Sequence, residues 1–166
     1  MRAKKITVIA MLAAVSIAGR IALMAIPQVK PVIAIVIISG SCVGPGSGFL
    51  VGAISMFTSN MILGQGIWTV WQMIAAGMMG VIFGMLPVKK RLSISVLGGI
   101  ATVLIYGGIM NVSSIFMFQK SPTLGAIALY CLYGLPFDII HGAATFAFLW
   151  VFYDRAKVLV EKYLGT

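Results

Sequence analysis

The side chains of this 166-residue chain that could do chemistry are few, and they lie inside long apolar stretches. Asp138 is followed three positions later by the single histidine, His141, and this spacing places both side chains on one face of a helix. The other polar or amphipathic side chains in or beside apolar stretches are Arg20, Asn60, Gln65, Trp68, Trp71, Gln72 and Asn111. Polar groups inside lipid are costly, so each of them needs a structural or functional reason.

Several kinds of catalysis are excluded by what the sequence lacks. It has no G-x-x-x-x-G-K-[ST] phosphate loop, no H-E-x-x-H zinc motif and no G-x-S-x-G nucleophile elbow. Two of the three acids, Asp154 and Glu161, fall in the C-terminal tail, which excludes a paired-carboxylate enzyme. Cys42 and Cys131 fit no metal spacing, and we expect them to pack as small hydrophobic residues. We therefore predict a non-catalytic protein with no metal and no cofactor.

The composition identifies the environment of the chain. The chain is 61% hydrophobic and 9% charged, whereas soluble domains average about 45–50% apolar residues and about 25% charged residues. A soluble globular enzyme and a disordered chain are thus excluded. Long, unbroken apolar runs predict helices and not the strands of a barrel.

The net charge of +9 does not indicate nucleic-acid binding in this chain, because the cations lie at particular places along it. Nine of the twelve cluster at three junctions between or beside apolar runs. Positively charged junctions face the cytoplasm. The nine residues are Arg2, Lys4, Lys5, Lys89, Lys90, Arg91, Arg155, Lys157 and Lys162.

The apolar runs predict six transmembrane helices in a single all-α domain over residues 1–166, with both termini in the cytoplasm. The first run is too long for a signal peptide and is taken as an uncleaved span. The predicted spans are 6–26, 32–43, 49–63, 68–86, 92–118 and 136–152.

Two parts of this assignment are unusual. The runs 32–43 and 49–63 are short for a full crossing of about 20 residues, so they are either short helices shielded by neighbours or a re-entrant pair. Gly134-Leu135-Pro136 is expected to break the chain, so that 123–133 forms a short helix at the outer surface and Pro136 begins the sixth span.

The polar side chains share one depth in this topology. They come from five spans and all fall in the outer half, which predicts an outward-facing pocket for a small polar or amphipathic solute. An ion relay would place polar groups across the full thickness. Other interpretations remain open for single residues. Arg20 and Asp138 could neutralise each other, His141 could be structural, the tryptophans could mark the membrane interface, and the asparagines could join helices.

A stripe of small residues occupies the first span. Ala10, Ala14, Ala18 and Ala22 recur every four positions, which permits close approach of another helix. The stripe therefore predicts either internal packing or a docking face for a partner subunit. For the pairs Gly48/Gly52 and Gly80/Gly84, we favour internal packing.

Four further motifs stand out along the chain. They are Lys30-Pro31, Gly44-Pro45-x-x-Gly48-Phe49, Asn60-x-x-x-Gly64-Gln65-Gly66-x-Trp68-Thr69 with Gln72-Met73, and Gly134-x-Pro136-Phe137-Asp138-x-x-His141. These motifs resemble those of the substrate-binding S components of energy-coupling factor (ECF) vitamin transporters, and are similar to the cobalamin-type branch. Ile67 departs from that branch, where proline is expected.

This resemblance implies a multi-pass subunit of the prokaryotic plasma membrane that binds a vitamin near its outer face, under loops that gate it. The subunit would deliver the vitamin by docking on a coupling subunit that carries two ATPases. Ala10, Ala14 and Ala18 resemble the docking motif. The candidate contacts for the solute are Lys30, Asn60, Gln65, Trp68, Trp71, Gln72, Asn111, Asp138 and His141.

Cobalamin is the first expectation for the transported solute. It predicts a wide outer basin, because a corrinoid exceeds an ordinary pocket of ~300–1,000 Å³. A small deep cavity would favour another vitamin or a modified nucleobase. A self-contained secondary transporter is the remaining alternative, but it predicts polar groups at the midplane and often an inverted repeat, and neither is visible.

Overall fold

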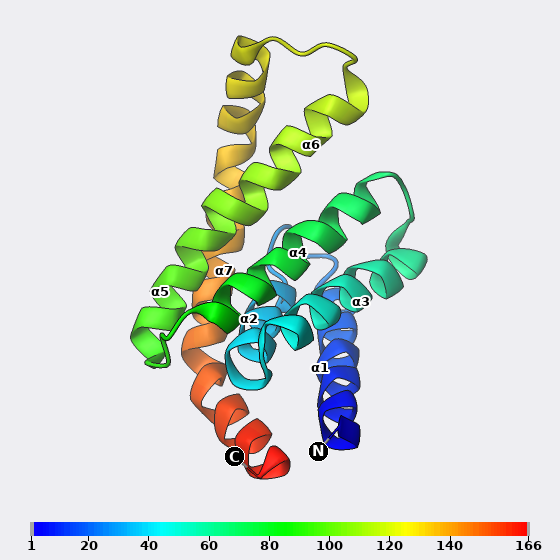
Figure 1. Ribbon diagram of the computed structural model, residues 1–166. Coiled ribbons are helices and arrows are strands. Elements are labelled where there is room, and N and C mark those ends of the chain that lie inside the picture. Colours follow the sequence, from blue (N-terminus) through cyan, green and yellow to red (C-terminus); the bar gives the residue numbers. More distant parts are fainter. Residues whose placement is uncertain (1, 166) are drawn as a thin grey trace.

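The computed structural model describes residues 2–165, and every regular element within them is a helix (Figure 1). The π-helical segment η1 joins α5 and α6 into one continuous rod. In chain order the elements are α1 (Arg2–Ala22), α2 (Val32–Val43), α3 (Pro45–Leu63), α4 (Trp68–Met85), α5 (Arg91–Ala101), η1 (Thr102–Gly107), α6 (Gly108–Phe118) and α7 (Leu124–Leu164).

Five helical segments are long and apolar enough to cross a membrane, and α2 is the shorter sixth helix. Nine of the twelve residues of α2 are buried, and its Val32, Ile33, Val36 and Ile37 lie at the centre of the hydrophobic core. A helix surrounded in this way does not have to face lipid along its length. The structure therefore favours a short helix shielded by its neighbours for the run 32–43.

The start of α3 and the end of α1 differ from the prediction. The expected break over 44–48 is confined to Gly44, whose φ of 126° suits glycine, and α3 begins at Pro45. Proline is favoured at a first helical position because it has no N–H to leave unpaired. α1 ends at Ala22, four residues before the predicted end, and a loop over 23–31 follows it.

The prediction that the chain breaks at Gly134-Leu135-Pro136 is wrong. α7 runs without interruption from Leu124 to Leu164, and Pro136 lies inside it. The separate surface helix over 123–133 is therefore the first part of α7, whose start is capped by the Thr123 hydroxyl accepting from the Ala126 N–H at 3.2 Å. Proline removes one backbone hydrogen bond, and membrane helices tolerate that loss where neighbouring groups compensate.

Glycines bring α2, α3 and α4 into backbone contact. A Cβ added to Gly48 would lie 2.7 Å from the Cα of Gly80, and one added to Gly84 would lie 2.5 Å from the Cα of Pro45. A Cβ on Gly52 would likewise lie 2.8 Å from the Ala76 carbonyl carbon. Such distances leave no space for a side chain, so the interpretation of the glycine pairs as internal packing is confirmed.

The three cation clusters meet at one end of the molecule. Lys4 lies over the ring of Tyr163, at 5.9 Å from its centroid, and Arg91 pairs with Asp154 at 3.6 Å. Lys89 donates to the carbonyl of Ser41, at the end of α2. The start of α1 and the end of α7 share this end, whereas the loop over 119–123 lies at the opposite one (Figure 1). The cytoplasmic assignment of the cationic end stays a prediction.

Candidate functional site

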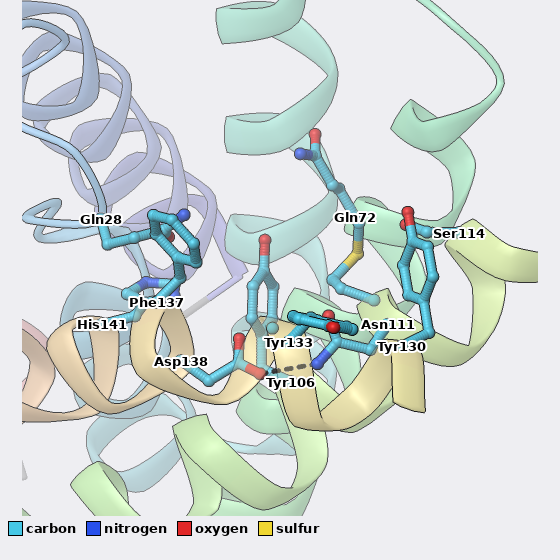
Figure 2. A pocket seen from close by; sticks show the side chains of 12 residues that line it. Gln28, Gln72, Tyr106, Asn111, Ser114, Tyr130, Tyr133, Phe137, Asp138 and His141 are labelled. Atoms are coloured by element: carbon cyan, nitrogen blue, oxygen red, sulfur yellow. Dashed lines mark hydrogen bonds between the residues drawn. The ribbon is translucent and has the colours of Figure 1, made fainter. Parts of the chain in front are cut away.

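A cavity of about 540 Å³ lies between the first loop and four helical segments (Figure 2). The loop over 23–31 contributes one side chain to its wall, and α4, η1, α6 and α7 contribute the others. The lining residues are Gln28, Gln72, Tyr106, Met110, Asn111, Ser114, Tyr130, Tyr133, Gly134, Phe137, Asp138 and His141.

The largest share of the lining comes from one face of α7. Tyr130, Tyr133, Phe137, Asp138 and His141 follow one another at intervals of one, three or four positions, which is the spacing of a single helical face. The sequence prediction missed the aromatic half of this face, because a break at Pro136 separates Tyr130 and Tyr133 from Asp138. The signal that could have found these residues is the helical spacing of three or four positions, which continues unchanged through Pro136.

The π-helical segment places Tyr106 in the cavity wall. A π-helix has i→i+5 hydrogen bonds, and such segments are frequent at functional sites. Tyr106 meets the imidazole of His141 edge-on, with the ring centroids 5.2 Å apart and an interplanar angle of 88°. His141 is 7% exposed, and no hydrogen bond to it is recorded within residues 2–165. Its ring nitrogens are thus available to a solute or water in the cavity.

Asn111 and Asp138 form a polar pair in the cavity wall (Figure 2). The Asn111 Nδ2 donates to Asp138 Oδ2 at 2.7 Å. Two glycines provide the space for these side chains. A Cβ on Gly107 would lie 2.5 Å from the Asp138 carboxyl carbon, and one on Gly134 would lie 2.5 Å from Asn111 Oδ1.

A second polar network lies behind Gln72 and links α1, α3 and α4. Arg20 donates to Asn60 Oδ1 at 2.7 Å and also to the hydroxyl of Ser59. Asn60 in turn donates through Nδ2 to Thr69 Oγ1 at 2.8 Å and to Gln72 Oε1 at 2.7 Å. Asn60 is 2% exposed, so it supports the cavity from behind and does not line it.

The structure does not support direct neutralisation of Arg20 by Asp138. Arg20 bonds to neutral groups on α3, whereas Asp138 bonds to Asn111 on α6. The ion pairs recorded within residues 2–165 are Arg91–Asp154 and Lys157–Glu161. The pairing interpretation for Arg20 and Asp138 was therefore wrong.

Of the nine candidate contacts, the cavity wall includes Gln72, Asn111, Asp138 and His141. Gln65 instead donates to the Phe57 carbonyl at 3.1 Å. The ring of Trp68 lies against Gly66, where an added Cβ would overlap it. Trp71 lines a separate, mostly apolar cavity beside η1 and α6. Both tryptophans are about two-fifths exposed, which suits residues at the membrane interface.

Lys30 belongs to the first loop and lies outside the cavity wall. Burial lowers the pKa of Lys30, and the positive charge of Arg20 lowers it further. From the same loop, Gln28 reaches the cavity with a backbone φ of 60°, a left-handed conformation that is uncommon for a residue other than glycine. The loop thus covers part of the site.

Comparison with known proteins identifies the family. The family model for the ECF transporter, substrate-specific component, matches residues 4–153, and the chain belongs to this family. Members of this family are non-catalytic, substrate-binding subunits. The family, together with the five helical segments that are long and apolar enough to cross a membrane, indicates that this chain is a multi-pass membrane protein.

Curated relatives match part of the chain. A UPF0397 protein of Aliivibrio salmonicida is 32% identical over 99 residues, which cover 55% of this chain and 54% of the relative. A UPF0397 protein of Aliivibrio fischeri is 32% identical over 94 residues, with 54% and 51% covered. The matched region thus spans about half the length of these relatives. No solved structure matches the chain.

Proposed function

We propose that this S component binds one compact, ring-bearing vitamin or nucleobase-like solute in the cavity between α4, α6 and α7. The observation that supports this proposal is the combination of the volume, about 540 Å³, with the lining. Tyr106, Tyr130, Tyr133 and Phe137 offer aromatic faces to a planar ring. Gln72, Asn111, Asp138 and His141 offer hydrogen bonds that fix its orientation.

The volume favours this alternative over cobalamin. Ordinary small-molecule pockets measure ~300–1,000 Å³, and a cavity of about 540 Å³ lies in that range and not in the range of the wide basin expected for a corrinoid. We propose that the protein binds this solute without changing it chemically.

Delivery of the solute requires partner subunits. We place the docking face at Ala10, Ala14 and Ala18, all of which are exposed on α1. The other side of α1 is occupied, since Val8, Ala13, Ser16 and Arg20 are buried. A row of methyl groups allows a partner helix to approach closely in lipid. The partners would be the ECF coupling subunit and its two ATPases, which supply the energy.

The test is a binding titration of the full chain in lipid nanodiscs, without ATP. The panel contains cobalamin and a set of vitamins and nucleobases with one to three rings. We expect tight binding of a compact compound and no binding of cobalamin. Tight cobalamin binding would restore the corrinoid assignment. Gradient-driven uptake by the chain alone in liposomes would contradict the S-component mechanism and support a secondary transporter.

A further inference from the structure

Arg20 is a buried cation whose recorded partners are all neutral. It lies in the last turn of α1, is 9% exposed, and bonds to Ser59 and Asn60. The carboxylates that form ion pairs within residues 2–165 do so with Arg91 and Lys157. A charge in an apolar segment without a counter-ion is expensive, and an apolar side chain would pack there at lower cost. The position of Arg20 therefore points to a role beyond packing.

The chemistry of Arg20 fixes the orientation of Asn60. A guanidinium group has five N–H donors and no acceptor, so the atom of Asn60 that faces it has to be the carbonyl oxygen. The 2.7 Å bond from Arg20 to Asn60 Oδ1 has this sense. The amide nitrogen of Asn60 is then directed away from α1, toward Thr69 Oγ1 and Gln72 Oε1.

No other member of the network can set this direction. The hydroxyl of Thr69 accepts from the Gly66 N–H at 3.4 Å, but it can still donate its own hydrogen or accept a second bond. The amide of Gln72 can turn to present either its oxygen or its nitrogen. Without Arg20, the two amides could exchange roles, with Gln72 donating to Asn60. With Arg20 present, Gln72 uses its oxygen to accept from Asn60, which leaves its two N–H donors for the cavity that it lines.

We propose that Arg20 is a positioning residue that sets the hydrogen-bond polarity of the solute site, acting through Asn60 to make Gln72 a donor. The Asn111–Asp138 pair supplies the complementary polarity. Because Asn111 Nδ2 donates to Asp138 Oδ2, the amide oxygen of Asn111 and the second carboxylate oxygen remain as acceptors. The site thus selects an amino-substituted nitrogen heterocycle, with N–H donors toward Asp138 and an acceptor toward Gln72. This inference rests on the proposed function of the cavity.

The experiment measures side-chain amide exchange without any solute. The full chain, ¹⁵N-labelled at asparagine and glutamine, is placed in lipid nanodiscs and transferred to D₂O. Signals are assigned from their loss in Asn60→Asp and Gln72→Glu. We expect slow exchange for the Asn60 amide, whose hydrogens are bonded to Thr69 and Gln72, and fast exchange for the Gln72 amide, which faces the cavity.

Arg20→Met should make the two exchange rates converge, because both amide orientations become populated. Each rate should change roughly tenfold, as expected for the loss of about one net hydrogen bond. Arg20→Lys is the conservative variant and should keep the difference, since an ammonium group also only donates. Arg155→Met is the matched control, because Arg155 is exposed in the C-terminal part of α7 and has no recorded bond to the network. Unchanged rates in Arg20→Met would overturn the proposal.

A second variant covers the case in which Arg20→Met fails to fold. Asn60→Asp keeps an acceptor for Arg20 but loses the donor to Gln72, so Gln72 should turn and its amide hydrogens should become protected. Continued fast exchange of Gln72 in this variant would overturn the proposal. Exchange results are independent of the vitamin titration, so either hypothesis can fail alone. A panel compound that binds tightly but lacks N–H donors would refute the solute class.

Discussion

Among single side chains, Asp138 is the one whose chemistry bears most directly on the proposed solute site. It is the carboxylate in the cavity wall, and it holds one hydrogen bond from Asn111. Its second oxygen can accept from a bound solute. Neither of the ion pairs found within residues 2–165 involves Asp138. An unpaired carboxylate in an apolar protein is more readily explained by ligand recognition than by packing.

Asp138→Asn should weaken solute binding while the fold is kept. The new amide oxygen can still accept from Asn111, but the group facing the cavity becomes a donor in place of an acceptor. Loss of one charge-assisted hydrogen bond predicts at least a roughly tenfold lower affinity in a calorimetric titration. Asp154→Asn is the matched control, since Asp154 is paired with Arg91 at the cationic end. Equal affinities of the two variants would remove Asp138 from the site.

A glycine provides a second test at the residue scale. In Gly134→Ala, the added methyl group would lie 2.5 Å from Asn111 Oδ1, so the Asn111 side chain has to shift and its hydrogen bond to Asp138 should weaken. We expect solute affinity to fall about tenfold, in line with the loss of one hydrogen bond. Gly125→Ala, in the same helix, meets nothing within 4 Å and should leave binding unchanged. Wild-type affinity in Gly134→Ala would indicate that the Asn111–Asp138 geometry is not required.

At the scale of elements, α7 supplies the largest share of the cavity wall. Because it is continuous over Leu124–Leu164, its aromatic residues before Pro136 and its ionisable residues after Pro136 share one face. A break at the proline would separate them. The continuity of α7 is therefore a condition for the cavity as described.

Spin labels can measure this continuity. With Cys42 and Cys131 replaced, labels at the exposed positions Leu124 and Ile139 lie fifteen residues apart on α7. A continuous helix at ~1.5 Å per residue predicts a backbone separation of about 22 Å and a narrow distance distribution in pulsed electron resonance. A chain that folds back at 134–136 would give a shorter and broader distribution, and that result would contradict the helix.

The sequence was sufficient to predict most elements, because long apolar runs and turn residues leave few choices in lipid. The spans 32–43, 68–86 and 92–118 agree with α2, α4 and the rod of α5, η1 and α6 to within one or two residues. The error at Pro136 has a physical cause. A proline that ends a soluble helix can be tolerated in an apolar helix packed among others, and local propensity does not distinguish the two cases.

The candidate site was predicted in part for a related reason. Polar side chains such as Gln72, Asn111 and Asp138 stand out in an apolar sequence, and these do line the cavity. Aromatic residues such as Tyr106, Tyr130 and Tyr133 do not stand out, because membrane interfaces also contain them. Depth alone also could not separate Asn60, which is buried behind the wall, from residues in the wall.

At the scale of the whole molecule, the two ends carry different kinds of side chain. The cation clusters gather where α1 begins and α7 ends, whereas the cavity lies toward the other end, under the loop over 23–31. α1 connects the two regions, because its exposed alanines lie along the same helix whose last turn carries Arg20. A partner bound to α1 would thus contact a helix that is hydrogen-bonded to the wall of the cavity.

The proposed docking face can be tested separately from the proposed solute site. Ala14→Trp and Ala18→Trp place a large ring on an exposed face, so neither should disturb the core or the cavity. Both should block the close helix contact that association in lipid requires. We expect solute binding by the isolated chain to stay at the wild-type level, while uptake by the assembled transporter in liposomes is lost. Ile100→Trp, at a 52% exposed position on α5, controls for bulk facing lipid and should transport normally. Normal uptake in both alanine variants would instead locate the partner on another face, whereas lost solute binding would show that the stripe supports the fold.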